Sequence, residues 1–317
     1  MLRKSLLFVL TVWLSTTIVH AQYDPSFNHY WMMEPEFNPA ATGNLQKLRI
    51  MGVYSMQMTG FTNAPRTMYA AADLPIYFLK NYHGIGAMFM NDEIGLFSHK
   101  RFSLQYSQQH RLWGGKISAG LQADLVSESF DGTKLDLEES NDPAFPTSKV
   151  DGTAFDMAVG IYYTARRWYA GLSMQHVLSP KVTLGQEQNK QNELKIDPTY
   201  YFTAGYNIKL RSPFITIHPS VLCKYDGTDF RADITGRLEY RHDKKCLYGG
   251  LGYSPSHSIT AFVGGLFHGV NVGYAYEAYT SMPSLTSGNT HEIIISYQMD
   301  LNLYKKGKNL HKSVRFL

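Results

Sequence analysis

The feature that most constrains the fold is a series of segments, each of about ten residues, in which apolar and polar side chains alternate. From Arg231 to Tyr240 the odd-numbered positions are charged or polar, whereas the even-numbered positions are small, aliphatic or aromatic. Successive side chains of a strand point to opposite faces, so such a segment has one polar and one apolar face. A wet interior and a lipid-facing exterior suit this pattern, which is typical of a transmembrane β-barrel.

The same alternation of apolar and polar residues recurs from Leu45 to Tyr304. It predicts about 14 strands, an even number, as single-chain bacterial barrels have. The expected strands centre near Val53, Ala70, Ala87, Leu104, Leu121, Val159, Leu172, Ala204, Val221, Thr235, Gly250, Ala261, Gly273 and Ile295. The sequence therefore predicts an all-β fold, an antiparallel transmembrane β-barrel over residues 45–304.

The lengths of the connections predict the orientation of this barrel. Long connections follow odd-numbered strands and comprise residues 127–152, 178–198 and 278–290. Short connections follow even-numbered strands and comprise residues 110–115, 165–167, 210–214 and 267–269. Outer-membrane barrels have short periplasmic turns and long outer loops, so both termini are expected in the periplasm. Aromatic residues near strand ends are expected in the interfacial girdles, namely Tyr162, Tyr163, Trp168, Tyr169 and Tyr253.

Composition fits an exported membrane protein. Only 18% of the residues are charged, 14% are aromatic, and the net charge of +4 is too small to indicate nucleic-acid binding. Cys223 and Cys246 are too few for a disulfide scaffold. They are expected near opposite rims of the barrel, too far apart to form a disulfide, and are predicted to be free thiols.

Residues 1–21 have the pattern of a signal peptide. Arg3 and Lys4 precede an apolar run from Leu6 to Val19, and Ala21 ends an acceptable small-residue cleavage site. Residues 22–44 follow neither a strand nor a helix pattern, because three prolines interrupt them, yet they carry five aromatic residues. Aromatics at this density need a surface to pack on, which predicts a plug-like segment inside the barrel.

The last residues, 305–317, form a basic tail. Its cations are Lys305, Lys306, Lys308, Lys312 and Arg315, together with His311. A solvated chain end is one interpretation of this charge run, and a periplasmic docking segment is the other.

No pattern of residues indicates an enzyme, a metal site or a cofactor site. The 12 histidines lack metal-ligand spacing, and no glycine-rich phosphate loop precedes a helix. An acidic stretch is interpreted as a solvated loop and comprises Asp131, Asp136, Glu138, Glu139 and Asp142. Four charges are expected to face the lumen, either lining a pore or forming an ion-pair ladder, and these are Arg231, Asp233, Arg237 and Glu239.

The segment behind the leader carries a family resemblance. Its motif residues are Gln22, Asp24, Pro25, Phe27 and Tyr30, followed by Asn38, Pro39, Ala40 and Gly43. This motif resembles the start of the PorP/SprF family of the type IX secretion system of Bacteroidetes bacteria. Further family-like pieces are Gly84-Ile85-Gly86 and Asn91 to Gly95, so that the similarity covers about residues 22–97.

The resemblance implies a non-enzymatic outer-membrane component of the type IX secretion or gliding machinery. Such a component would bind or retain secreted cargo proteins that carry a conserved C-terminal domain. Its other expected partners are periplasmic ring and peptidoglycan-linked subunits and outer-membrane lipid. The main alternative left open by the residues themselves is a passive or gated outer-membrane channel, of the porin or fatty-acid-transporter type, and a surface enzyme barrel is a third.

Overall fold

The computed structural model of the protein describes residues 24–45, 47–60, 63–134, 148–184, 193–243, 245–280 and 288–300. Within the described residues, three short helices precede the strands, η1 (Tyr30–Met32), α2 (Glu34–Phe37) and η2 (Pro39–Ala41). The strands are β1 (Lys47–Met56), β2 (Arg66–Phe78), β3 (Asn81–Ile94), β4 (Phe97–Leu112), β5 (Gly115–Asp131), β6 (Lys149–Thr164), β7 (Trp168–Gln175), β8 (Lys181–Thr183), β9 (Glu193–Lys195), β10 (Thr199–Tyr206), β11 (Ile208–Lys209), β12 (Ile215–Tyr225), β13 (Phe230–His242), β14 (Lys245–Ser254), β15 (Ser258–Phe267), β16 (Val270–Tyr279) and β17 (Thr290–Asp300). A further short helix, η3 (Gly132–Lys134), follows β5.

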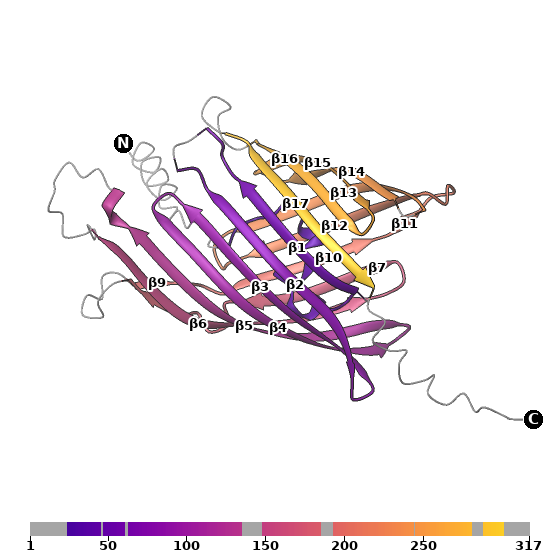
Figure 1. The fold of residues 1–317 in the computed structure, drawn as a ribbon, viewed down its shortest axis with the longest axis horizontal. Coiled ribbons are helices and arrows are strands. Elements are labelled where there is room, and N and C mark those ends of the chain that lie inside the picture. Colours follow the sequence, from indigo (N-terminus) through magenta and orange to yellow (C-terminus); the bar gives the residue numbers. More distant parts are fainter. Residues whose placement is uncertain are drawn as a thin grey trace, which may run out of the picture.

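The described strands form a closed antiparallel barrel of 14 strands (Figure 1), which confirms the predicted all-β antiparallel barrel and its strand number. Apart from β8 and β9, which form a separate two-stranded sheet, strands that follow one another in sequence are neighbours in the barrel, and the barrel closes where β1 pairs with β17. β11 continues the line of β10 along β12. The break between β10 and β11 lies opposite Pro219, which has no backbone N–H to donate to the ladder.

The outward faces of the strands form an exposed apolar band. Its exposed side chains include Phe89, Leu104, Leu121, Leu172 and Leu251. Apolar side chains of this size, exposed all around a barrel, suit contact with lipid. None of the described helices is long and apolar enough to cross a membrane.

Strands β3 to β6 rise beyond the apolar band on the side of the long connections. The outward face of β5 changes there from the exposed Leu125 to Ser127 and Ser129. β5 continues to Asp131 and β6 begins at Lys149, so the connection between them is shorter than the predicted loop 127–152. About five residues of each strand, roughly 16 Å, thus extend past the lipid-facing part on one side of the barrel.

The short β8–β9 hairpin packs against this extension. Val182 and Ile196 are buried together with Val126 of β5. This hairpin lies within the predicted long connection 178–198, which therefore contains secondary structure of its own.

The aromatic-girdle prediction was wrong for two of its five residues. Tyr162 and Tyr169 stack with their ring centroids 5.7 Å apart, on the inner face of the barrel. Tyr163 and Trp168 alternate with them and pair on the outer face, with centroids 5.1 Å apart. Cys223 and Cys246 are both free, as predicted.

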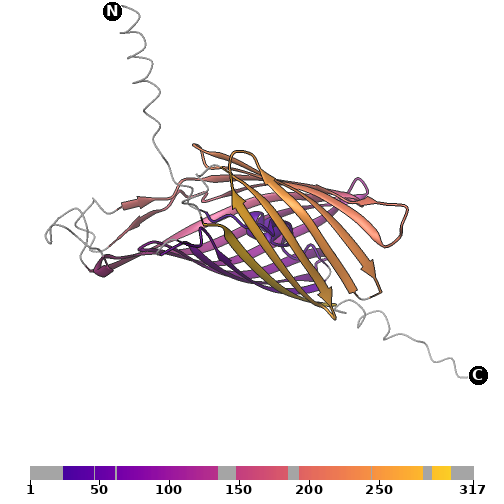
Figure 2. The ribbon, with the colours of Figure 1, turned by 90° about the horizontal axis from the view of Figure 1, so that it is seen from above.

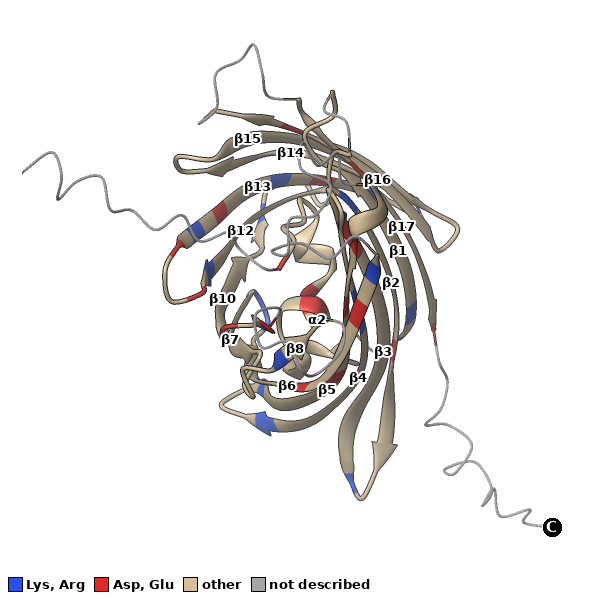
Figure 3. Cartoon of the chain, turned by 90° about the vertical axis from the view of Figure 1, so that its left-hand side faces the viewer, with Lys and Arg blue, Asp and Glu red and all other residues tan. Residues whose placement is uncertain are grey.

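Residues 24–44, here called the N-terminal segment, lie among the inner faces of the strands. Figure 2 shows this segment in indigo within the barrel, and Figure 3 shows α2 encircled by strands. η2 packs against β4, β5 and β6. The described chain thus starts inside the barrel at Asp24 and ends at Asp300, at the rim with the short turns.

Candidate functional site

The N-terminal segment owes its compact shape to its prolines and to Asn38. Pro35 and Pro39 stand in the first turns of α2 and η2, where the missing N–H has no helical partner to lose. The Asn38 side chain caps η2 by accepting a hydrogen bond of 2.9 Å from the Ala40 N–H. The same side chain donates to the Ile161 and Leu172 carbonyl oxygens, so it fixes the segment to β6 and β7.

Asp24, the first described residue, is clamped by side chains near the long-connection end of the barrel. Its carboxylate accepts a hydrogen bond of 3.0 Å from the Tyr201 hydroxyl and lies 3.1 Å from His176 Nε2. Lys224 Nζ donates to the Asp24 carbonyl oxygen at 2.6 Å. Burial alone would raise the pKa of Asp24, but His176, Lys224 and Arg101 lower it well below its usual range.

His176 lies between two carboxylates. Its Nδ1 is 2.6 Å from Asp156 Oδ2, on the side of the ring opposite Asp24. Burial lowers the pKa of His176, but the two carboxylates outweigh this effect and raise the pKa to about 9. A doubly protonated ring can donate to both carboxylates at once, and it links the N-terminal segment to β6.

Arg101 of β4 is the largest fully buried side chain, with 1% of its surface exposed. Its guanidinium donates to Glu36 of α2 and, at 2.9 Å, to Gln175 Oε1. Asp24 Oδ1 lies 3.8 Å from the same guanidinium. Gln175 in turn donates to the Glu36 carbonyl oxygen, so one buried network holds two separate parts of the segment.

The carboxylate of Glu292 on β17 holds residues near the start of the segment. It accepts hydrogen bonds from the backbone N–H groups of Asn28 and His29, at 2.8 and 2.9 Å. The His29 ring contacts the same carboxylate through Nδ1 at 2.7 Å. Both Glu292 and His29 are fully buried, so these bonds have no competing solvent.

The other end of the segment is held by Asp73 and by close backbone contact. Asp73 accepts from the Gly43 N–H at 2.9 Å and pairs with Arg49, which also donates to the Met32 carbonyl oxygen. Gly43 has φ +65, the left-handed conformation that glycine adopts readily. Its neighbour Thr42 lies so close to Gly84 that a Cβ built on Gly84 would stand 2.0 Å from the Thr42 carbonyl oxygen.

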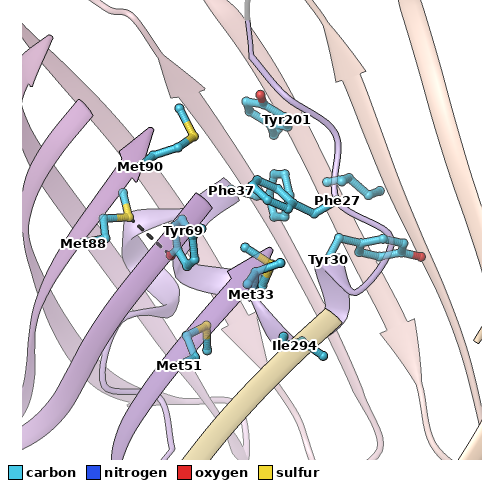
Figure 4. Packing of buried hydrophobic residues seen from close by; sticks show 12 residues of the cluster. Phe27, Tyr30, Met33, Phe37, Met51, Tyr69, Met88, Met90, Tyr201 and Ile294 are labelled. Atoms are coloured by element: carbon cyan, nitrogen blue, oxygen red, sulfur yellow. Dashed lines mark hydrogen bonds between the residues drawn. The ribbon is translucent and has the colours of Figure 1, made fainter. Parts of the chain in front are cut away.

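Apolar side chains of the segment fill the middle of the barrel. Phe27 lies 5.8 Å from Tyr69 and 6.4 Å from Phe37, and Phe37 lies 5.6 Å from Tyr201, between ring centroids. Figure 4 shows these rings with Tyr30 and the surrounding methionines. The expected aromatic packing surface thus consists of side chains from the inner faces of several strands.

The predicted motif residues lie together in this site, apart from Gln22, which is outside the described residues. Asp24, Asn38 and Gly43 make the hydrogen bonds given above. The Tyr30 hydroxyl donates to the Asp233 carbonyl oxygen at 3.2 Å and contacts Ser220 Oγ at 3.1 Å. Phe27, Pro39 and Ala40 are buried, and Pro25 is half-buried.

The four predicted lumen charges lie in two places on β13. Arg231 pairs with Asp233 at 2.9 Å and with Glu277 at 3.2 Å. Arg237 lies over the Trp31 ring, 3.7 Å from its centroid, and Glu239 pairs with Arg241. Three predicted features fall outside the described residues. They are the leader, the basic tail and, within the acidic stretch, Asp136, Glu138, Glu139 and Asp142.

Sequence reasoning missed the residues that hold the segment most firmly. These are Glu36, Arg101, Asp156, His176 and Glu292. One signal was present in the strands, because Arg101 falls in the same alternating positions as Ser103 and Gln105, the polar face of β4. A cation at an inward position of a strand needs an anionic partner, but nothing local says which one.

Residues 19–297 match the model of the family described as type IX secretion system membrane protein PorP/SprF. The chain belongs to the PorP/SprF family. No curated protein is detectably similar to it in sequence. The membrane barrel fold of this PorP/SprF protein and its family fit an outer-membrane location.

Solved structures with a similar fold include a hydrocarbon channel and a FadL homologue. The CymD monoaromatic hydrocarbon channel is 13% identical, with a TM-score of 0.52 over 89% of this chain and 95% of that one. A Pseudomonas aeruginosa FadL homologue is 11% identical, with a TM-score of 0.45 over 83% of this chain and 92% of that one. At this identity the CymD likeness establishes that the PorP/SprF chain shares a barrel fold, and nothing about what it binds.

The position of His176 predicts that the N-terminal segment is held less firmly at alkaline pH. A pKa raised to about 9, from 6.5, stabilises the docked segment fully below pH 6.5, and this stabilisation is lost as the pH rises through about 9. The lowered pKa of Asp24 stabilises the docked segment equally over this whole range, because its contribution is lost only in acid, as the pH falls below the usual pKa of an aspartate. We expect docking to weaken by about 1 to 2 kcal/mol between pH 6.5 and 9.5, less than the full rise in the pKa implies, because Asp156 stays beside His176 when the segment leaves.

A nitroxide spin label at Ser26, with both native cysteines replaced by serine, measures this change as a rise in the mobile fraction of the spectrum. His176→Gln is the control, because it removes the titrating ring and should give a spectrum that no longer changes over this range. A wild-type spectrum constant from pH 6.5 to 9.5 would contradict the prediction.

Proposed function

We propose that this protein is an outer-membrane barrel of the type IX secretion or gliding machinery that acts as a closed scaffold, with its N-terminal segment as a plug. The barrel would bind or retain cargo proteins with a conserved C-terminal domain and contact periplasmic ring and peptidoglycan-linked subunits. The short turns and the C-terminal tail would face the periplasm, and the long connections would face outward. The proposal includes a cleaved leader, residues 1–21, and no catalytic role.

The observation that carries the proposal is that the segment makes contacts all around the barrel wall. It hydrogen bonds to Asp73 of β2, Ser173 of β7, Lys224 of β12 and Glu292 of β17. A segment anchored on all sides by buried polar groups leaves little room for free passage along the axis. Protein binding at the mouth of a closed barrel is therefore a better use of this arrangement than conduction.

The one-sided extension of β3 to β6 supports an outward binding surface. It presents polar outer faces and carries the β8–β9 hairpin beyond the apolar band. Rigid strands position a recognition surface more precisely than loops of the same length. We place cargo contact at this extension and its neighbouring loops.

Deletion of residues 22–43 tests the role of the segment. We expect export of the cargo to be lost, because the scaffold loses its internal support, while the shortened barrel still inserts. Mass spectrometry of culture medium and cell surface measures export, and heat-modifiable migration on gels measures barrel folding. Normal export from a strain carrying the deletion would overturn the proposal.

A gated channel is the second candidate, supported by the titratable clamp of His176 and Asp24 at one end of the segment. Planar-bilayer recording of the full-length protein separates the two functions. A steady open-pore current would favour the channel. A full-length barrel that stays closed even above pH 9, where the clamp of His176 is lost, would favour the scaffold.

A further inference from the structure

Two neighbouring short turns at the rim opposite the β8–β9 hairpin form an unusual surface. The turn between β4 and β5 consists of Trp113 and Gly114, with φ of +48 and +76. Positive φ at both central residues is typical of a type I′ hairpin turn, in which asparagine and glycine are usual and a bulky aromatic is strained. Trp113 nevertheless occupies this position, with 88% of its side chain exposed.

A cavity of about 680 Å³ opens between this turn and the turn that joins β6 to β7. Three cations line it, Arg111, Lys116 and Arg166, and its lining contains no acidic residue. Arg111 and Lys116 are direct cross-strand partners, an arrangement in which like charges repel each other. None of the three makes an ion pair with a described residue, so their charge is uncompensated within the described part of the chain.

Two neutral hydroxyl groups, those of Thr164 and Tyr163, also belong to this region. Thr164 lines the cavity, and its hydroxyl oxygen accepts a hydrogen bond of 3.1 Å from Asn44 Nδ2. The hydroxyl hydrogen of Thr164 is then free to be donated to a ligand. The Tyr163 hydroxyl donates to the Leu112 carbonyl oxygen at 3.2 Å and holds the two turns together.

We propose that this cavity binds a phosphate-bearing anion. Two arginines and a lysine line one cavity, and arginine in particular binds phosphate oxygens in pairs. The phosphate has two possible sources, the headgroup of an anionic phospholipid in the adjacent leaflet and free inorganic phosphate. Trp113 lines the cavity with its indole exposed, and Tyr163, which pairs with Trp168 on the outer face, hydrogen bonds to Leu112 of the lining. Aromatic residues are enriched in this way at membrane interfaces.

Binding is measured on the purified full-length protein in phosphate-free neutral detergent. The probes are phosphatidylglycerol, followed by native mass spectrometry, and sodium phosphate, followed by calorimetry. The test variant is R111Q/K116Q/R166Q. The matched control is K209Q/R211Q/K245Q, which removes the same charge from other positions along this rim.

We expect the wild type and the control to bind within about twofold of each other, and the test variant to bind about 100-fold more weakly, since each cation contributes roughly 1 kcal/mol to anion binding. Binding of phosphatidylglycerol without binding of free phosphate assigns the site to lipid. Binding of both probes assigns it to the phosphate group itself.

Three results would overturn the proposal. They are no binding of either probe to the wild type, equal losses in test and control variants, and tighter binding of polyglutamate than of either probe, which would indicate a protein-docking surface. If the triple variant fails to show heat-modifiable migration, R166Q alone, which changes an exposed turn residue, is used with an expected loss of about fivefold. These measurements do not involve export, so their failure is independent of the secretion role.

Discussion

Replacing Arg101 by methionine is expected to release the N-terminal segment from the barrel wall. Methionine keeps the bulk of the side chain but leaves the buried carboxylates of Asp24 and Glu36 without their shared cation. Removing one partner of a buried ion pair costs about 3 to 5 kcal/mol, because the remaining charge stays desolvated. The barrel itself should persist, since its backbone ladders do not depend on this guanidinium.

Hydrogen–deuterium exchange of the amides in residues 24–44 measures this release, at pH 7 in detergent. We expect protection of these amides to fall about 100- to 1000-fold, while amides of β14 to β16 keep theirs. Arg241→Met is the matched control, because Arg241 is largely exposed at the rim and its pair with Glu239 is worth at most about 1 kcal/mol. Equal protection in the Arg101 variant and the wild type would show that this network does not hold the segment.

Adding one methyl group at each of two wall glycines should have a comparable effect. A Cβ at Gly84 would stand 2.0 Å from the Thr42 carbonyl oxygen, and a Cβ at Gly120 would stand 2.2 Å from the Ala40 backbone nitrogen. Backbone atoms cannot rotate away as a flexible side chain can, so the segment must shift. Overpacking costs about 1 to 3 kcal/mol at a site, so the double variant G84A/G120A should lose more than about 2 kcal/mol of docking free energy.

Chymotrypsin reports the displacement, because the segment contains Phe27, Tyr30 and Phe37, which are protected while it is docked. We expect cleavage at these positions in G84A/G120A and little in the control G236A/G249A. In the control a Cβ at Gly236 would meet nothing within 4 Å, and one at Gly249 would make an ordinary 3.6 Å contact. Identical digestion of the two double variants would contradict this account of the wall glycines.

The barrel was predictable because its signal is local. Alternation within β13 or β17 depends only on neighbouring residues, and each strand repeats it, so strand number and strand centres follow from counting. The ends of β5 and β6 were less predictable, because outside the lipid both faces of a strand can be polar and the alternation disappears. Tyr162 was assigned to the girdle from its place near a strand end, although its position between Ile161 and Tyr163 sets it on the inner face.

The candidate site was predictable only in part. Prolines and aromatics mark the N-terminal segment as unusual, and the family motif includes Asp24, Asn38 and Gly43, which hydrogen bond to the barrel wall. Its partners were not predictable, because Arg101, His176 and Glu292 come from three distant parts of the chain. Alternation says which face such a side chain takes, but only the closed barrel brings them to one place.

The contact between Glu292 and His29 has a consequence for assembly. These residues are separated by 263 positions, and Glu292 lies on the last strand. The backbone of His29 therefore gains its hydrogen bond to Glu292 only once β17 is in place, a contact of very high sequence separation that forms late. A docked N-terminal segment would thus distinguish a complete barrel from one that lacks its last strand. Only the complete barrel would present an ordered surface to other proteins.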